Sequence, residues 1–380
     1  MRILHTSDWH VGRTIRGRGR ANEHRAVLTE IAGIAAKEGV DLILVAGDLF
    51  DVVAPSPESE QIVFRALLDL ADIAPVVAVA GNHDHPRRLE AVAPLLELGR
   101  VQVGATLRRP DEGGVITAET DSGESARIAL VPFVGQRAIV SASDLMALDP
   151  DQHGGKYATR LAGVIARLNE GISLDQVNLV VAHLMVAGGT LGGGERSAHT
   201  IFDYAVSSQA FDGSLSYVAL GHLHRPQKVP APAPTWYSGS PLQMDFGETE
   251  DRKAVLLIEA EAGTPARVRE VALLAGRRLR RIRGTLEQIV AFQDEVGDAY
   301  LRVELEEPAR VGLADDVREL FPDAVDVVIA TPEDVREATP PVRLGRPPHE
   351  LFSEYLTQKN AFDERLLALF DELLAESHET

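Results

Sequence analysis

The first hundred residues alternate three times between a short apolar run and a longer segment with helical periodicity. A strand, a helix and a second strand in succession form parallel strands joined by a crossover helix. Pro86 stands at the start of the third helical segment, where a helix tolerates proline. The apolar runs lie at 3–6, 42–46 and 76–80, and the helical segments at 21–38, 58–72 and 86–98.

Residues 114–134 have the pattern of a β-hairpin, with the turn at Asp121 to Ser125. A helix is expected around 156–170. Together with the first hundred residues, these segments predict a mixed, layered α/β domain over residues 1–272. Its remaining strands are expected at 179–182, 217–220, 236–238 and 255–259.

A second, smaller unit is expected after Ala275 and Gly276. The basic segment 277–284 reads as a strand, and 285–330 as helix, strand, helix, strand, with Thr285 as a good N-cap. This predicts a small α/β capping domain at 276–331.

A Pro-rich linker at 332–348 leads to a helical tail at 349–377. Apolar residues in the tail recur at i, i+3 and i+4, as in an amphipathic helix. Either the tail packs on its own domain or it docks on a partner. Docking is favoured, because a tail that packs on its own domain needs no flexible tether.

Five short polar motifs each follow an apolar strand, the position where open α/β sheets bind their ligands. Side chains at i and i+2 of an extended chain lie on one side, so Asp8 and His10 of the first motif can reach one cation. His222 and His224 of the fifth motif form the same kind of pair. The motifs are Ser7-Asp8-Trp9-His10, Gly47-Asp48, Gly81-Asn82-His83-Asp84, His183 and Gly221-His222-Leu223-His224.

Any one motif has an ordinary explanation, since a lone Asp after a strand is usually a helix N-cap and a lone His is usually structural. Five in succession predict a metal site. A shared carboxylate, which we assign to Asp48, can bridge two ions roughly 3.5 to 4 Å apart, a separation suited to phosphoester hydrolysis. The chain has no cysteine. The oxygen and imidazole ligands favour manganese, with iron, zinc or magnesium as alternatives.

The formal net charge of −19 argues against nucleic acid, because binding a polyanion normally uses Lys and Arg to neutralise phosphates. Charge is local, however, and two basic segments stand out. Arg13, Arg16, Arg18 and Arg20 lie beside the first motif and are candidates for contacting DNA. Segment 277–283 holds five arginines in seven residues and could be a strand of the small capping domain that faces DNA. Ion pairing with the acidic surface is the alternative explanation.

The motifs SDWHVGR, GDLFD, GNHD and GHLH resemble those of the calcineurin-like metallophosphoesterases, and within them the SbcD nucleases, relatives of the eukaryotic double-strand-break repair nuclease. The resemblance extends across nearly the whole chain. It implies a metal-dependent nuclease for DNA repair, recombination and replication. Such an enzyme is an exonuclease on duplex DNA with its ATP-dependent partner and an endonuclease on single strands and hairpins.

The resemblance also implies two overlapping metal sites that share one carboxylate. One would comprise Asp8, His10, Asp48 and His224, and the other Asp48, Asn82, His183 and His222. His83 would be a catalytic residue that binds no metal and protonates the leaving oxygen, with Asp84 orienting it. A role for His83 as a ligand or a packing group stays open.

The resemblance implies as partner an SbcC-type ATPase, whose coiled-coil base the tail binds, and a homodimer within a heterotetramer. No Walker lysine follows the glycines at 188–194, so ATP is expected to bind the partner, and this loop is expected to be a flexible surface loop. The N-terminus lacks a secretory signal and no apolar run reaches membrane-spanning length, so we expect a cytoplasmic protein without a membrane segment.

Two other functions use the same residues. A small-molecule phosphodiesterase or phosphatase would hydrolyse phosphate esters with the same ligands. A non-catalytic scaffold of the ATPase complex would use the metals only for structure. The extra domain, the arginine-rich strand and the tail favour DNA, and the intact ligand set argues against a scaffold.

Overall fold

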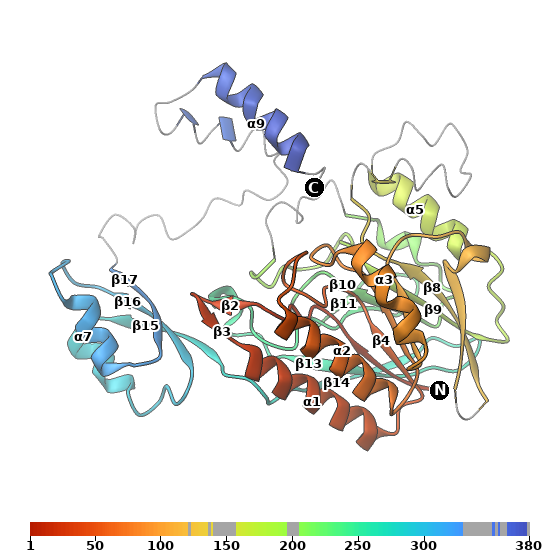
Figure 1. Cartoon of the computed structure of the whole chain (residues 1–380), viewed down its shortest axis with the longest axis horizontal. Helices are drawn as coiled ribbons and strands as arrows, with labels where there is room; N and C mark the ends of the chain where they lie inside the picture. Colours follow the sequence, from red (N-terminus) through yellow and green to blue (C-terminus); the bar gives the residue numbers. More distant parts are fainter. Residues whose placement is uncertain are drawn as a thin grey trace.

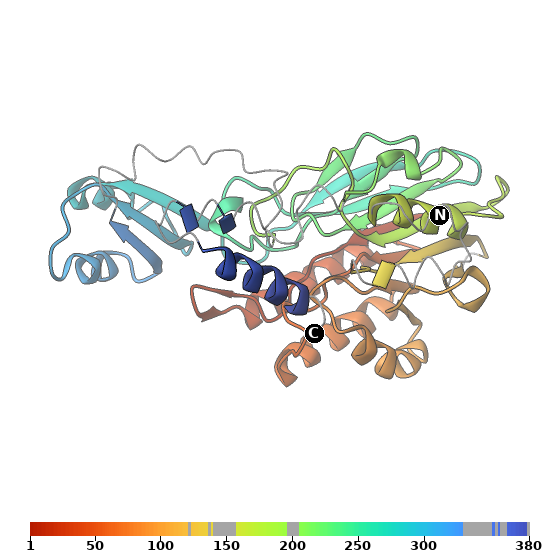
Figure 2. The ribbon, with the colours of Figure 1, turned by 90° about the horizontal axis from the view of Figure 1, so that it is seen from above.

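Two six-stranded β-sheets lie face to face and form the body of the molecule (Figure 1). Seen from above, the half coloured green and teal lies over the half coloured red and orange, and a small domain extends from one end (Figure 2). This computed structural model describes residues 1–120, 123–135, 138–139, 157–195, 205–329, 352–353, 356–357 and 363–377.

The first sheet has the strand order β14-β13-β1-β4-β5-β6. Four of its strands are parallel, namely β1 (Arg2–Thr6), β4 (Leu42–Val45), β5 (Val76–Val79) and β6 (Val101–Gly104). The antiparallel strands β13 (Ala254–Glu259) and β14 (Arg267–Ala272) extend the other edge. The crossover pattern of the sequence is confirmed, whereas β6 and β14 were not predicted.

Helices α1 (Ala21–Glu38), α2 (Pro57–Ala71) and α3 (Pro86–Glu97) connect the strands and cover the outer face of this sheet. They agree with the predicted segments to within one residue at each end. Ser56 caps α2 by accepting a hydrogen bond from the Ser59 N–H, and Pro57 follows at the first helical position. Gly39 ends α1 in the left-handed conformation.

The second sheet has the strand order β11-β12-β10-β9-β8-β7. Its central strands β8, β9, β10 and β12 are parallel, and the predicted hairpin forms from β7 and β8. Helix α5 (Tyr157–Leu168) packs on its outer face. The strands are β7 (Val115–Glu119), β8 (Ser125–Val131), β9 (Val177–His183), β10 (Tyr217–Gly221), β11 (Gln227–Val229) and β12 (Thr235–Tyr237).

The core between the sheets explains why the strands read as continuous apolar runs. Every residue of β4, β5, β9 and β10 is buried, because one face of each strand meets the other sheet and the opposite face meets helices or loops. Burying one such aliphatic side chain contributes about 1.5 to 3 kcal/mol. This rigid core fixes the strand ends on which the polar motifs lie.

The small domain is a parallel three-stranded sheet with its own core. It comprises β15 (Leu279–Gly284), α6 (Leu286–Ile289), β16 (Tyr300–Leu305), α7 (Leu313–Leu320) and β17 (Ala324–Ile329). The predicted order of strands and helices is confirmed, and Thr285 caps α6 through a capping box with Gln288. An apolar cluster of Ile15, Phe246, Leu279 and Tyr300 joins the domain to the body.

The tail contains helix α9 (Glu364–Ser377), which lies apart from both domains in Figure 1. The Phe352 and Phe370 rings stack 4.2 Å apart, so the tail packs partly on itself. The predicted linker at 332–348 and much of 349–363 lie outside the described residues. Among the helices of the described part, none has the length and hydropathy to cross a membrane.

Candidate metal centre

The five motifs converge at one edge of the two sheets. Asp8, Asp48 and Asn82 follow β1, β4 and β5 of the first sheet, while His183 ends β9 and His222 follows β10 of the second. Backbone hydrogen bonds join the first two loops, with the Asp8 N–H donating to the Gly47 carbonyl at 2.9 Å and the His10 N–H to the Asp48 carbonyl at 3.0 Å. Residues far apart in the chain therefore meet at one place.

One group of ligand atoms comes from Asp8, His10 and His224. These atoms lie within 4.8 Å of one another, and all three residues are buried. The Nε2 atoms of His10 and His224 are 3.1 Å apart. Such an approach of two imidazole nitrogens suits a shared cation, because both can offer lone pairs to it.

A second group surrounds Asn82. Its Oδ1 atom lies 2.9 Å from His183 Nε2 and 2.9 Å from His222 Nδ1. Asp48 lies between the two groups, with Oδ2 3.4 Å from His183 Nε2 and 3.5 Å from His10 Nε2. The seven predicted metal ligands are thus brought together in two adjoining sets with Asp48 between them.

The backbone at the site is strained. Six residues other than glycine have positive φ in the described part of the chain, and four of them are predicted ligands: Asp8 at 52°, His10 at 45°, Asp48 at 51° and His222 at 108°. This conformation costs a non-glycine residue of order 1 to 3 kcal/mol and concentrates at functional sites. The loops therefore hold these side chains at the cost of stability.

Two glycines of the motifs are required by close packing. A Cβ atom on Gly47, where φ is +89°, would lie 2.4 Å from His183 Nδ1. A Cβ on Gly81 would lie 2.1 Å from Asp48 Oδ1. Any side chain at either position would displace a predicted ligand, which explains why glycine precedes the polar residue in both motifs.

Burial and mutual interaction shift the pKa values of the cluster. Burial lowers the pKa of His183, but the neighbouring Asp48 and Asp8 carboxylates and the Ala46 carbonyl raise it to about 9. Burial also raises the pKa of Asp8 to about 6, although His183 and His224 oppose the rise. Buried carboxylates and imidazoles at this density fit divalent cations, whose positive charge satisfies both ligand types.

His83 is held by the backbone around it. Its N–H donates to Asp48 Oδ1 at 2.8 Å, and its Nδ1 lies 2.6 Å from the Asp51 carbonyl oxygen. The ring also meets the His10 ring edge to face, with the ring centres 4.6 Å apart. One of its nitrogens lies within 4.8 Å of ligand atoms of His10 and Asp48, so this geometry alone leaves both roles for His83 open.

Asp84 binds the backbone of two motif loops. Its carboxylate accepts backbone N–H groups of Leu49 at 3.2 Å, Phe50 at 3.0 Å and Gly81 at 2.8 Å. Burial and the nearby Asp48 raise the pKa of Asp84 to about 7 despite these donors. Asp84 therefore ties the second motif loop to the third, while the Asp51 carbonyl lies beside the imidazole of His83. That Asp84 orients His83 stays a prediction.

The arginines beside the first motif have partners within the protein. Arg20 is buried and donates to both Glu23 oxygens and to the Gln243 carbonyl, so it is unavailable to DNA. Arg16 and Arg18 pair with Asp326 and Asp323 of the small domain. Arg13 contacts Asp51 Oδ1 at 3.3 Å. The expected contact with DNA is wrong for the buried Arg20. Arg16 and Arg18 connect the two domains, and contact of Arg13, Arg16 and Arg18 with DNA stays a prediction.

Several residues of the site were missed from the sequence. Phe133 stacks on the His222 ring with the centres 6.3 Å apart. Glu248 and Glu195 contact His224, at Nδ1 and at the backbone N–H respectively. The glycine loop 188–194, expected at the surface, packs through Gly194 against His224 and Glu248. None of these residues lies in a short polar motif at the end of a strand, so the pattern that predicted the ligands did not include them.

The sequence around this centre matches a known protein family. The family model for calcineurin-like phosphoesterases matches residues 1–226, a span that contains all five motifs. The chain belongs to the calcineurin-like phosphoesterase family. The layered α/β fold expected from the sequence is therefore that of a metallophosphoesterase.

Curated relatives place this phosphoesterase in a narrower group. It is 34% identical to the SbcD subunit of the nuclease SbcCD from Bacillus subtilis (strain 168) over 313 residues, 80% of this chain and 78% of the relative. It is 35% identical to the corresponding SbcD protein of Rhodobacter capsulatus, over 70% and 68% of the two chains. The Escherichia coli K12 protein is 28% identical over 78% and 74%. The chain therefore belongs with the SbcD branch of the phosphoesterases.

Proposed function

We propose that this phosphoesterase is the nuclease component of an SbcCD-type complex and hydrolyses DNA phosphodiester bonds with two divalent ions. The observation that carries the proposal is the convergence of seven ligand residues in two adjoining sets around Asp48. The similarity to SbcD proteins of the nuclease SbcCD supports nuclease activity and a role in DNA repair.

The two ions would be held by overlapping sets of residues. The first set is Asp8, His10, Asp48 and His224, and the second is Asp48, Asn82, His183 and His222. When bound, a pair of divalent ions supplies Lewis acidity, which neutralises charge on phosphate oxygens and acidifies an attacking water. Carboxylate, amide and imidazole donors favour manganese over iron, zinc and magnesium.

His83 would act on the leaving group. The Asp51 carbonyl can only accept a hydrogen bond, so Nδ1 of His83 carries the proton in that contact. When the ring is doubly protonated, Nε2 also carries a proton and can give it to the leaving 3′ or 5′ oxygen of DNA, with a contribution of about 10² to 10⁴ in rate. Asp51 and Asp48 position this imidazole through the backbone contacts described above.

The small domain would face the DNA. Arg278 and Arg281 are exposed on and beside β15, and neither forms an ion pair within the described residues. Together with Arg280, Arg283 and Phe292 they line a hollow of about 560 Å³. A basic edge of this kind can bind phosphates although the whole chain is acidic, because electrostatic attraction acts over about a Debye length.

The partner would be an SbcC-type ATPase that binds the ATP and docks the tail on the base of its coiled coil. Two copies of each protein would form a heterotetramer in the cytoplasm around a homodimer of this chain. The exposed Leu366 and Leu369 of α9 support docking, because such apolar side chains on an amphipathic helix suit a groove on a partner.

The competing functions have less support. A phosphatase or small-molecule phosphodiesterase would not need the arginine-lined hollow or the tail. A scaffold would not need four ligands in strained backbone conformations, which cost stability and are found where chemistry requires them.

A nuclease assay tests the proposal. The purified chain with Mn²⁺ should nick circular single-stranded DNA, and chelation should stop it. Digestion of linear duplex DNA should require the ATPase partner and ATP in addition. A chain that binds two ions but cleaves only a small phosphodiester would favour the phosphodiesterase alternative.

A further inference from the structure

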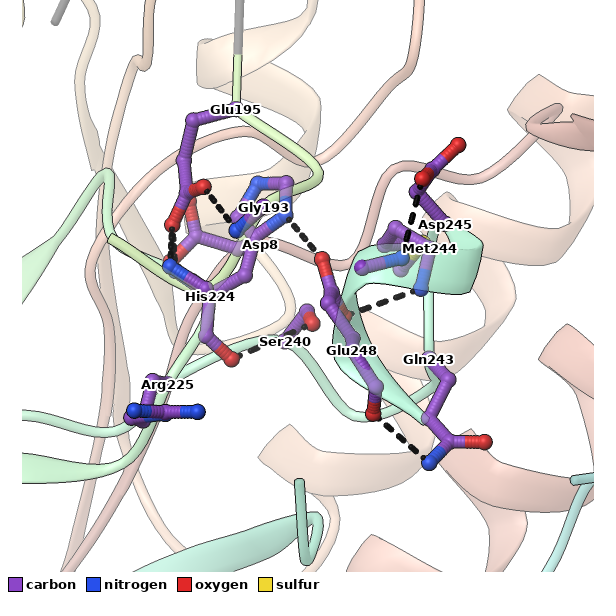
Figure 3. A network of polar contacts seen from close by, with 12 residues as sticks. Asp8, Gly193, Glu195, His224, Arg225, Ser240, Gln243, Met244, Asp245 and Glu248 are labelled. Carbon is purple, nitrogen blue, oxygen red and sulfur yellow. Dashed lines mark hydrogen bonds and ion pairs between the residues drawn. The ribbon is translucent and has the colours of Figure 1, made fainter. Parts of the chain in front are cut away.

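A buried carboxylate lies behind His224. The two ring nitrogens of His224 point in different directions, with Nε2 3.1 Å from His10 Nε2 and Nδ1 3.0 Å from Glu248 Oε1. Figure 3 shows the imidazole directed at Glu248, which stands on the short turn Phe246–Glu248. His224 thus faces the metal centre with one nitrogen and Glu248 with the other.

Glu248 is held in place from several sides. Its side chain is fully buried, and Oε2 accepts from Lys253 Nζ at 2.6 Å and from the Met244 N–H at 3.0 Å. Lys253 is buried too, and its ammonium also donates to the His224 carbonyl and to Ser240 Oγ, each at 2.9 Å. All three N–H donors of the ammonium are therefore used, and one of them fixes the backbone of His224 itself.

The hydrogen bond to Glu248 selects one tautomer of His224. A carboxylate paired with a buried ammonium is ionised and can only accept, so the imidazole proton lies on Nδ1. The lone pair of Nε2 then points toward Asp8 and His10. This is the form of imidazole that binds a metal ion, and a carboxylate behind the ring typically fixes it.

The glycine loop provides independent support for the importance of this contact. A Cβ on Gly194 would lie 2.1 Å from Glu248 Oε1 and 2.8 Å from His224 Nδ1. Glu195, the next residue, accepts the His224 N–H at 3.0 Å and the Gly193 N–H at 2.7 Å (Figure 3). The loop thus closes over the pair, and glycine at 194 leaves room for it.

We propose that Glu248, charge-balanced by Lys253, is a positioning residue that holds His224 in the tautomer and orientation that bind a divalent cation. The inference rests on the proposed function, because it takes His224 to be a metal ligand. It deepens that function by adding a residue outside the five motifs on which metal affinity depends.

Equilibrium dialysis of the full chain against Mn²⁺ tests the inference. In Glu248→Gln the amide can donate as well as accept, so it no longer dictates the tautomer of His224. We expect Mn²⁺ to bind about 10- to 100-fold more weakly at one of the two sites. The matched control is Glu250→Gln, the same change at an exposed position two residues along the chain, and should bind Mn²⁺ as the wild type does.

A second variant separates positioning from charge balance. Glu248→Gln leaves the buried Lys253 without its carboxylate, whereas Glu248→Gln with Lys253→Met removes both charges. If Glu248 positions His224, the double variant regains the thermal midpoint but keeps the weak Mn²⁺ binding. Recovery of wild-type affinity in the double variant would overturn the inference.

Gly194→Ala tests the contact without altering any charge. The added methyl group must displace Glu248 or His224, so Mn²⁺ affinity should fall as in Glu248→Gln. Wild-type affinity in both Gly194→Ala and Glu248→Gln, with two ions bound in the wild type, would refute the inference alone. A wild-type chain that binds no Mn²⁺ would instead refute the proposed function.

Discussion

His83 Nδ1 lies 2.6 Å from the carbonyl oxygen of Asp51, so a residue of the second motif orients the imidazole of the third. The carbonyl accepts, and the proton of the contact belongs to His83. The backbone N–H of His83 donates to Asp48, which links the residue to the centre of the predicted ligand sets. Nδ1 therefore anchors the ring, and Nε2 is the nitrogen proposed to transfer a proton.

Replacing His83 with Leu should therefore abolish hydrolysis while both ions stay bound. The expected loss is about 10² to 10⁴ in the cleavage rate, as for removal of a general acid. Bound Mn²⁺ per chain is to be measured on the same samples as the nuclease rate. His85→Leu, two residues along the chain and exposed, is the control and should keep both. Loss of an ion together with activity would make His83 a ligand.

Acid should destabilise the protein through its buried histidines. Burial lowers the pKa of His5 from 6.5 to about 3, and burial together with Arg20 lowers that of His24 to about 4. Below pH 6.5, His5 and His24 bind protons in the unfolded chain but stay neutral in the folded chain. Stability should then fall as pH drops toward these folded values, by up to about 1.4 kcal/mol per pH unit and per histidine.

His5→Gln tests this dependence, because glutamine is neutral at every pH and can still contact the Tyr217 hydroxyl, 2.9 Å from His5 Nδ1. Denaturant unfolding between pH 6.5 and 5 should show a shallower loss of stability than in the wild type. Adding His24→Gln should flatten the curve further. Wild-type and variant curves that run parallel over this range would contradict the expectation.

Arg281→Ala should weaken DNA binding and its salt dependence. Loss of one phosphate contact reduces the slope of log K against log salt by about 0.9 for duplex DNA. Arg18→Ala is the matched control, because its guanidinium contacts Asp323 and the Pro322 carbonyl of the small domain. Fluorescence anisotropy with a short duplex at several salt concentrations measures both. An equal effect of the two variants would argue against DNA binding at β15.

Removing the tail from Pro347 onward should leave Mn²⁺-dependent endonuclease activity, because all predicted ligands lie between Asp8 and His224. The same truncation should abolish co-purification with the ATPase partner, since α9 with its exposed Leu366 and Leu369 is lost. Co-expression followed by affinity purification measures the second effect. A truncated chain that still purifies with the ATPase would show that another surface makes the contact.

The sequence predicted the body of the fold well because its strands are short, continuous apolar runs separated by helices with clear periodicity. Strands β6, β11 and β14 were missed because they lie at the edges of the sheets, where a strand needs no continuous apolar pattern. β14 has no fully buried residue. Such strands are specified by pairing with a neighbour, which local sequence does not reveal.

That the predicted ligands lie close together could be foreseen for a different reason. Each ligand lies in a short polar motif directly after a buried strand, and parallel strands bring their carboxyl ends together. Glu248 and Lys253 lie in the polar run 248–253, which does not directly follow a buried strand. The partners of Arg16 and Arg18 lie more than 300 residues away, so only the assembled domains show that these arginines are engaged within the protein.

A crystal structure with anomalous scattering from Mn²⁺ tests the central claim most directly. The account predicts two peaks roughly 3.5 to 4 Å apart, one beside Asp8, His10 and His224 and one beside Asn82, His183 and His222, with Asp48 touching both. A single peak, or ions bound away from these residues, would contradict it.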